Sequence, residues 1–172
     1  MAVKQILTEP NKLLRQVSKE VEIVGKNEQK LMDDMMDTMY AANGIGLAAV
    51  QIGVPKRIIV MDICKKEGKK EPLYFVNPII KNKDSLKATY EEGCLSVPDQ
   101  FAEIDRPSRC EVEYLDYSGD KKLLKADGLL ATCIQHEMDH LEGILFIDYL
   151  SKLKRSMIVK KLSKLKSNTT VL

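Results

Sequence analysis

Apolar residues recur at helical spacing in three segments of the chain. In 27–43 they fall on one face of a helix, with polar residues on the other. The same period returns in 127–141 and in about 149–167. The apolar positions of the first segment are Leu31, Met32, Met35, Met36, Met39 and Tyr40. The pattern predicts one early helix and two helices that close the chain.

Runs rich in β-branched and aromatic residues lie between the first and second predicted helices. They span 57–61, 73–76 and 110–117, and Ser118-Gly119-Asp120 predicts a hairpin turn into 121–125. A helix, then several strands, then two helices predict an α+β fold. A chain of 172 residues is the right size for one domain with one core, so we expect 1–172 to form a single domain.

The composition of the chain, 44% hydrophobic and 30% charged, is that of a globular protein. No apolar run approaches the roughly 20 residues of a membrane span, and the first residues lack the apolar region of a secretory signal. We therefore expect a cytoplasmic protein with neither a membrane nor DNA as its partner. Without a secretory signal, reduced thiols or metal ligands are the expected states of Cys64, Cys94, Cys110 and Cys133.

The strongest chemical signal is an HExxH motif formed by His136, Glu137 and His140. His136 and His140 are the only two histidines of the chain. On a helix, residues four apart share a face with Cβ atoms about 5–6 Å apart, so both imidazoles can reach one ion. Two alternatives stay open: a chance pair of core histidines, and a structural metal site, which usually has four protein ligands.

A helical wheel assigns the neighbours of the motif to faces. Leu129 and Cys133 share the face of the two histidines, which continues an apolar stripe into the core. The opposite side is expected to be polar and comprises Ala131, Gln135, Asp139 and Glu142.

The third metal ligand is expected upstream of the motif. Phe146 stands where one HExxH class has its last histidine, no glutamate follows Glu142, and Asp148 is the only later carboxylate. Upstream, Cys94 can supply a thiolate, and two histidines with one cysteine leave a fourth position for water. A buried, inert thiol is the alternative reading of Cys94.

A glycine-rich segment, 44–53, follows the first predicted helix. It lacks the lysine of a phosphate-binding loop and has no preceding strand of a dinucleotide fold. We interpret it as a strand-like wall for a substrate, with the single side-chain amide of Gln51.

These three segments together resemble the peptide deformylase family. Its members carry GxGLAAxQ, EGCLS and QHExDH segments in this order, and here they occupy 44–51, 92–96 and 135–140. The resemblance covers nearly the whole chain. It implies mixed β-structure wrapped around a central HExxH helix, with a C-terminal helix packed outside.

The resemblance also implies a metal centre and a reaction. Cys94, His136 and His140 would hold one divalent ion, most often Fe²⁺, with Ni²⁺, Co²⁺ or Zn²⁺ as substitutes. The reaction would be hydrolysis of the N-formyl group of formylmethionyl nascent peptides, which releases formate. Metal-bound water would attack and Glu137 would act as general base and then as acid, while Gln51 and the Leu95 N–H would stabilise the oxyanion. The expected substrate-binding residues are Gly44, Ile45, Gly46, Glu92, Leu129, Thr132 and Cys133.

Two residues depart from what the family leads us to expect. Thr132 stands where we expect an apolar wall of the methionine pocket, and its hydroxyl could bond the carbonyl four residues earlier. Phe101 stands where some bacterial members carry an arginine near the peptide. Both departures bear on peptide preference rather than on the chemistry.

Basic character is concentrated after Ser151. This tail has seven Lys or Arg and no acid, whereas the preceding residues carry 20 basic against 25 acidic side chains. We expect an apolar stripe to pack on the domain and the basic residues to face outward. The stripe would comprise Leu150, Leu153, Met157, Leu162 and Leu165, and the outward face Lys152, Lys154, Arg155, Lys160, Lys161, Lys164 and Lys166.

Two readings of the tail stay open. It is a solvated helix face, or it docks on the ribosome, as the resemblance implies, through RNA phosphate. For the whole chain, the alternatives are an HExxH metallopeptidase that cuts ordinary peptide bonds and a non-catalytic protein that binds metal or RNA.

Overall fold

The computed structural model describes residues 2–64 and 68–169. Three α-helices are interspersed with seven strands and three short 3₁₀ helices in this part of the chain. The α-helices are α1 (Lys26–Ala41), α2 (Gly128–Leu141) and α3 (Lys152–Thr169). The strands are β1 (Gly46–Ala48), β2 (Ile58–Met61), β3 (Leu73–Lys83), β4 (Lys87–Cys94), β5 (Val97–Pro107), β6 (Arg109–Leu115) and β7 (Lys121–Asp127). The 3₁₀ helices are η1 (Lys12–Arg15), η2 (Ala49–Ile52) and η3 (Phe146–Tyr149).

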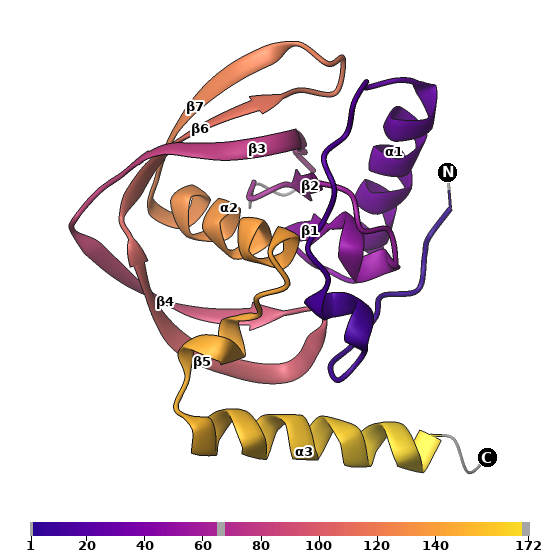
Figure 1. Cartoon of the computed structure of the whole chain (residues 1–172), viewed down its shortest axis with the longest axis vertical. Coiled ribbons are helices and arrows are strands. Elements are labelled where there is room, and N and C mark those ends of the chain that lie inside the picture. Colours follow the sequence, from indigo (N-terminus) through magenta and orange to yellow (C-terminus); the bar gives the residue numbers. More distant parts are fainter. Residues whose placement is uncertain (1, 65–67, 170–172) are drawn as a thin grey trace.

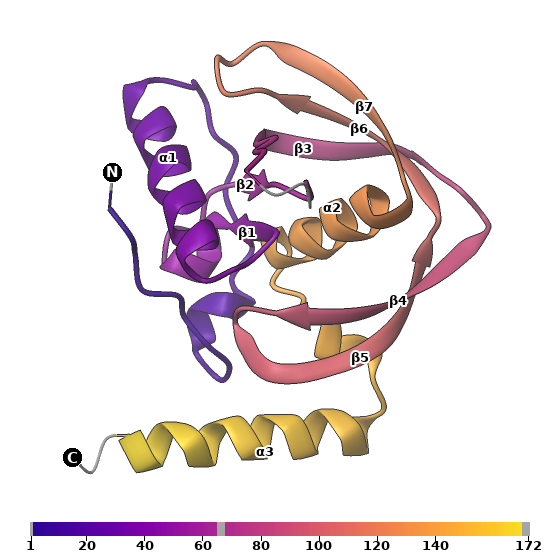
Figure 2. The ribbon, with the colours of Figure 1, turned by 180° about the vertical axis from the view of Figure 1, so that it is seen from behind.

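The strands form two antiparallel layers with α2 between them. One sheet has the order β1-β2-β3-β6-β7, and the other is the hairpin β4-β5. The chain bends from the first layer into the second between β3 and β4 and returns between β5 and β6 (Figure 1). The view from behind shows the same enclosure of α2 (Figure 2). The expected α+β fold, with β-structure wrapped around the HExxH helix, is confirmed.

The burial of α2 differs from the helical wheel. Ala131 and Gln135, expected on a polar outer side, are both buried. The Gln135 side chain donates to the carbonyl of Pro107, at the end of β5, because the second layer covers the side that the wheel assigned to solvent. Only Glu142, just past the helix, stays exposed as expected.

The apolar segments predicted as strands do form strands. Strands also form in polar segments where the sequence pattern did not predict them. The predicted strand 73–76 continues to Lys83 through an irregularity in register between Val76 and Ile79, which accommodates Pro78. The predicted hairpin after 110–117 is present as β6 and β7. The sequence analysis missed β4 and β5, whose outer faces are rich in charged residues.

The first helix was predicted correctly, but the packing of the last helix was not. Among the described side chains of α3, only Leu162 is buried, and Ile158 and Val159 are half-buried. Leu153, Met157 and Leu165, which were expected to pack on the domain, are 72%, 63% and 52% exposed. Figure 1 shows the reason: α3 runs along the outside of the molecule, below β5, and only one side of it meets the domain.

The cysteines and the helices bear on two expectations drawn from composition. Within the described residues, Cys64, Cys94, Cys110 and Cys133 are not joined in disulfides. Within residues 2–64 and 68–169, no helix has the length and apolar character needed to cross a bilayer.

Candidate metal centre and substrate cavity

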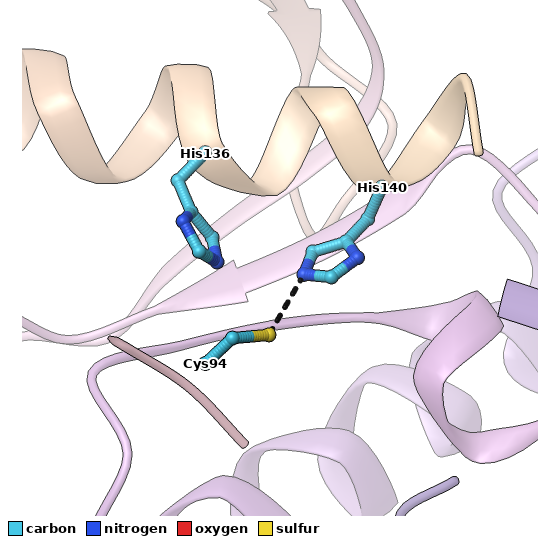
Figure 3. Close-up of side chains that lie close together, drawn as sticks. All are labelled: Cys94, His136 and His140. Carbon is cyan, nitrogen blue, oxygen red and sulfur yellow. Dashed lines mark hydrogen bonds between the residues drawn. The ribbon is translucent and has the colours of Figure 1, made fainter. Parts of the chain in front are cut away.

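The expected metal ligands converge from two elements. Cys94 ends β4, and His136 and His140 lie one turn apart on α2. One ligand atom from each of the three lies within 4.8 Å of the other two. Figure 3 shows both imidazoles directed from α2 toward the thiol, with 3.3 Å between Cys94 Sγ and His140 Nε2.

The chemistry of this donor set fits a divalent transition metal. A thiolate and two imidazoles are the ligands of catalytic zinc and related ions, and three protein ligands leave a position open. Burial lowers the pKa of His140, which keeps the imidazole in the neutral form that binds metal. Asp148, the only carboxylate after Glu142, is not a member of this cluster, and its side chain accepts a hydrogen bond from Arg15 at 2.6 Å.

A buried ion-pair network orients His136. The Nδ1 atom of His136 lies 2.8 Å from Oε2 of Glu92. Arg106 holds the same carboxylate through two hydrogen bonds, of 2.5 Å from Nε and 3.0 Å from Nη2. Burial acts to raise the pKa of Glu92, but the hydrogen bonds from His136 and Arg106 outweigh it and lower that pKa. An imidazole that donates from Nδ1 to a carboxylate presents Nε2 to a metal.

The network continues through Asp139 to Tyr149, at the end of η3 and just before α3. The third nitrogen of Arg106, Nη1, donates to Asp139 at 2.8 Å, and the Tyr149 hydroxyl donates to the same Asp139 oxygen at 2.8 Å. The Arg106 guanidinium also lies 5.0 Å from the centre of the Tyr149 ring. The sequence analysis missed Arg106 and Tyr149. The signal for Arg106 was its two-residue spacing from Ala102 and Ile104, which places it on the inward face of β5.

Glu137 is buried beside the expected metal ligands. Burial raises its pKa to about 7, and its Oε2 atom is sealed from solvent without a hydrogen-bond partner in the structure. The other carboxylate oxygen, Oε1, lies against Gly46. A Cβ at position 46 would stand only 2.5 Å from it. Glycine at 46 thus lets β1 approach α2 closely enough to enclose the carboxylate.

The expected carbonyl-binding groups lie beside Cys94. The Gln51 amide oxygen accepts from the Ala48 N–H at 2.8 Å, which fixes the side chain. Its Nε2 atom lies 3.0 Å from Ser96 Oγ and 3.6 Å from Cys94 Sγ. Leu95 follows directly after Cys94 and lines the same cavity.

A cavity of about 470 Å³ opens beside this centre. Its walls include all the predicted site residues except His140: Gly44, Ile45, Gly46, Gln51, Glu92, Cys94, Leu95, Leu129, Thr132, Cys133, His136 and Glu137. Three segments far apart in the sequence thus meet around one space.

The two unusual residues also line the cavity. Phe101 is 66% exposed and lies close over Gly93, where a Cβ would approach its ring to 2.6 Å. Thr132 is buried, and the expected bond from its hydroxyl to the carbonyl four residues earlier is not formed. The hydroxyl makes no hydrogen bond with any residue in the described ranges.

Comparison with known proteins gives one consistent result. The family model for polypeptide deformylase matches residues 3–156. Among curated relatives, the peptide deformylase of Pelagibacter ubique is 78% identical over 99% of both chains, and that of Maricaulis maris is 53% identical over 98% of this chain and 97% of its own.

Solved structures give the same picture. The peptide deformylase of Ehrlichia chaffeensis superposes with a TM-score of 0.94 at 44% identity, covering 99% of this chain and 100% of the other. A complex of peptide deformylase from the same organism with actinonin gives 0.91 at 48% identity, covering 95% and 98%. Because the family model matches most of the chain and these relatives match nearly all of it, the chain belongs to the polypeptide deformylase family.

Proposed function

We propose that this protein removes the formyl group from formylmethionyl nascent peptides by metal-dependent hydrolysis, releasing formate. The observation that carries the proposal is the convergence of Cys94, His136 and His140 beside the buried carboxylate of Glu137, at the wall of a cavity large enough for a peptide terminus.

The proposed cofactor is one divalent ion, Fe²⁺ by preference, with Ni²⁺, Co²⁺ or Zn²⁺ able to substitute, as the family resemblance implies. When bound, such an ion lowers the pKa of a water molecule from about 16 to near 7 and polarises a carbonyl group. Glu92 would orient the His136 ring, and Arg106 would hold Glu92 in place. This role accounts for the carboxylate of Glu92 better than peptide contact does, because both of its oxygens already accept hydrogen bonds.

Glu137 is the proposed general base and acid. A carboxyl group with a pKa of about 7 exchanges protons readily near neutral pH. Glu137 would accept a proton from the attacking water and return it to the departing amine. Gly46 leaves the space that this carboxylate needs.

Gln51 and Leu95 are proposed to stabilise the oxyanion. The Gln51 Nε2 and the Leu95 backbone N–H would donate to the formyl oxygen as it becomes negative, and one such donor contributes about 3–4 kcal/mol. The hydrogen bond from Ala48 pre-orients the Gln51 amide, so little reorganisation is needed. The peptide terminus would lie against the remaining wall residues, Gly44, Ile45, Leu129, Thr132 and Cys133.

The test is anaerobic purification, measurement of bound metal, and an assay of formate release from a formylmethionyl peptide. Glu137→Ala should keep its metal and lose roughly 10²-fold or more of the formate release rate. Full activity of this variant would remove Glu137 from the mechanism. Cleavage of unformylated peptides would instead favour a metallopeptidase, and no turnover with any of the four metals would favour a non-catalytic metal-binding protein.

We further propose that residues 1–172 act as one catalytic domain in the cytoplasm, docked on the ribosome through α3. In support, all seven basic residues of 152–166 are exposed, and RNA phosphate attracts such a surface. Changing Lys152, Lys154 and Lys160 to Gln should weaken co-sedimentation with ribosomes. The matched control changes Lys121, Lys122 and Lys125 of β7 to Gln. Association that is insensitive to salt, or equal in both triple variants, would count against docking.

A further inference from the structure

Two buried threonines on helices differ in how their hydroxyls are satisfied. On α1, the Thr38 hydroxyl donates to the Asp34 carbonyl at 2.6 Å and accepts the Lys4 N–H at 2.9 Å. On α2, Thr132 is only 4% exposed, yet its hydroxyl has no hydrogen-bond partner among the residues that the structure describes. A hydroxyl that is cut off from water without gaining a partner costs free energy, so a ligand that covers Thr132 gains if it accepts a hydrogen bond from this hydroxyl.

The Thr132 hydroxyl has access to the cavity. Thr132 lines the cavity. Some unpartnered side-chain atoms in the described ranges are sealed from solvent. The Thr132 hydroxyl is not one of them, so it is open to the cavity. A group in the cavity can therefore reach it, and the missing partner is best sought in a bound ligand.

The position of Thr132 along α2 indicates which atom of the substrate it meets. Thr132 precedes the metal ligand His136 by four residues, which is roughly 6 Å along a helix axis. In a formylmethionyl terminus, the path from the formyl carbon to the thioether sulfur also spans roughly 6 Å when extended. With the formyl group at the metal ligands and the side chain directed along α2, the sulfur lies at the level of Thr132.

The neighbouring wall is otherwise apolar at this level. Leu129 and Cys133 flank Thr132 on the same helix and line the same cavity. A thioether sulfur is a weak hydrogen-bond acceptor and cannot donate, whereas a threonine hydroxyl can donate. An apolar wall with one hydroxyl donor thus matches a side chain that is apolar except for one acceptor atom.

We propose that the Thr132 hydroxyl donates a hydrogen bond to the methionine sulfur and thereby selects methionine over all-carbon side chains of the same shape. The inference rests on the proposed function and adds a specificity-determining residue to it. Norleucine, with a methylene in place of sulfur, would fill the same space but leave the hydroxyl unpaired.

The test is a comparison of two formylated peptides that differ only in methionine or norleucine at the first position. The ratio of their kcat/KM values is measured for the wild-type protein and for Thr132→Val, which keeps the shape and removes the hydroxyl. Intrinsic differences in hydrophobicity cancel when the two ratios are divided. We expect the wild-type preference for methionine to exceed that of Thr132→Val by roughly three-fold to ten-fold.

Three further variants control the comparison. Thr132→Ser keeps a hydroxyl and should retain most of the preference. Thr89→Val makes the same chemical change at an exposed threonine of β4, outside the cavity, and should leave both rates and their ratio unchanged. Thr132→Ala replaces Thr132→Val if the latter does not fold.

The outcomes separate this inference from the proposed function. Equal ratios in the wild-type protein and in Thr132→Val, with formate released from both peptides, would overturn the role of the hydroxyl and leave the proposed function standing. No formate release from either peptide by the metal-loaded wild-type protein would overturn the proposed function itself.

Discussion

The two helices that close the chain have the same apolar periodicity but differ in how much of their surface is buried. Both α2 and α3 follow from the same helical spacing, and they are separated only by a short segment that contains η3. In α2 even polar side chains such as Gln135 and Glu137 are buried, whereas α3 leaves Leu153 and Met157 largely exposed. A pattern of apolar positions therefore predicts that a helix forms, but not how many of its sides are covered.

The difference arises from what surrounds each helix. Two layers of strands enclose α2 and satisfy part of the polar atoms that it buries, while Glu137 Oε2 and the Thr132 hydroxyl keep no partner among the described residues and face the site. Gln135 bonds Pro107, and Asp139 bonds both Arg106 and Tyr149. By contrast, α3 meets the domain along one side only. A buried site with several polar groups needs the first arrangement, because the surrounding strands supply partners for the groups that do not face the substrate.

The largest expected effect tests the polar packing against α2. Arg106→Met should lower the free energy of unfolding by about 3–5 kcal/mol, because it leaves the buried carboxylate of Glu92 and the half-buried carboxylate of Asp139 without their cation. Urea denaturation of the metal-loaded protein measures this change. The matched control is Arg109→Met on β6, whose ion pair with Asp84 is exposed and should contribute less than about 1 kcal/mol. Similar losses in both variants would mean that burial does not strengthen the Arg106 network.

The apolar packing of α2 gives the next effect. Ile134 is completely buried between the layers, so Ile134→Ala should destabilise the protein by about 2–5 kcal/mol through lost burial and a residual cavity. Thermal and urea unfolding should agree on this loss. Leu123→Ala, at an exposed position of β7, should change stability by no more than about 0.5 kcal/mol. If Ile134→Ala lowered the free energy of unfolding by less than about 1 kcal/mol, the core around α2 would be able to repack and fill the cavity.

The smallest effect concerns the attachment of α3. Leu162 is the one buried side chain among those described in α3, so Leu162→Ala should loosen α3 without unfolding the rest. Hydrogen exchange should become faster in 152–166 and stay unchanged in α2. Leu153→Ala, at an exposed position of the same helix, should alter neither. Faster exchange in α2 after Leu162→Ala would mean that the two helices unfold together, which would contradict the separation drawn between them.

Local chemistry in the sequence was sufficient to predict much of the site. The HExxH motif placed two histidines on one face because helical geometry fixes that relation within a few residues. The lack of a suitable ligand after Glu142 directed attention to Cys94, and the structure brings all three together. Gln51 and Gly46 were expected at the site, and they line its cavity.

The sequence by itself determined the helices, the apolar strands and the motifs that carry the chemistry, because these depend on neighbours within one or two turns. Only the tertiary structure decided that β4 and β5 cover α2, that Arg106 links Glu92 to Asp139, and that Leu153 and Met157 stay exposed. It also decided that the Thr132 hydroxyl is left for the cavity while the Thr38 hydroxyl bonds its own helix. The physical reason is that burial and hydrogen-bond partners are set by residues far apart in the chain, whose approach no local pattern records.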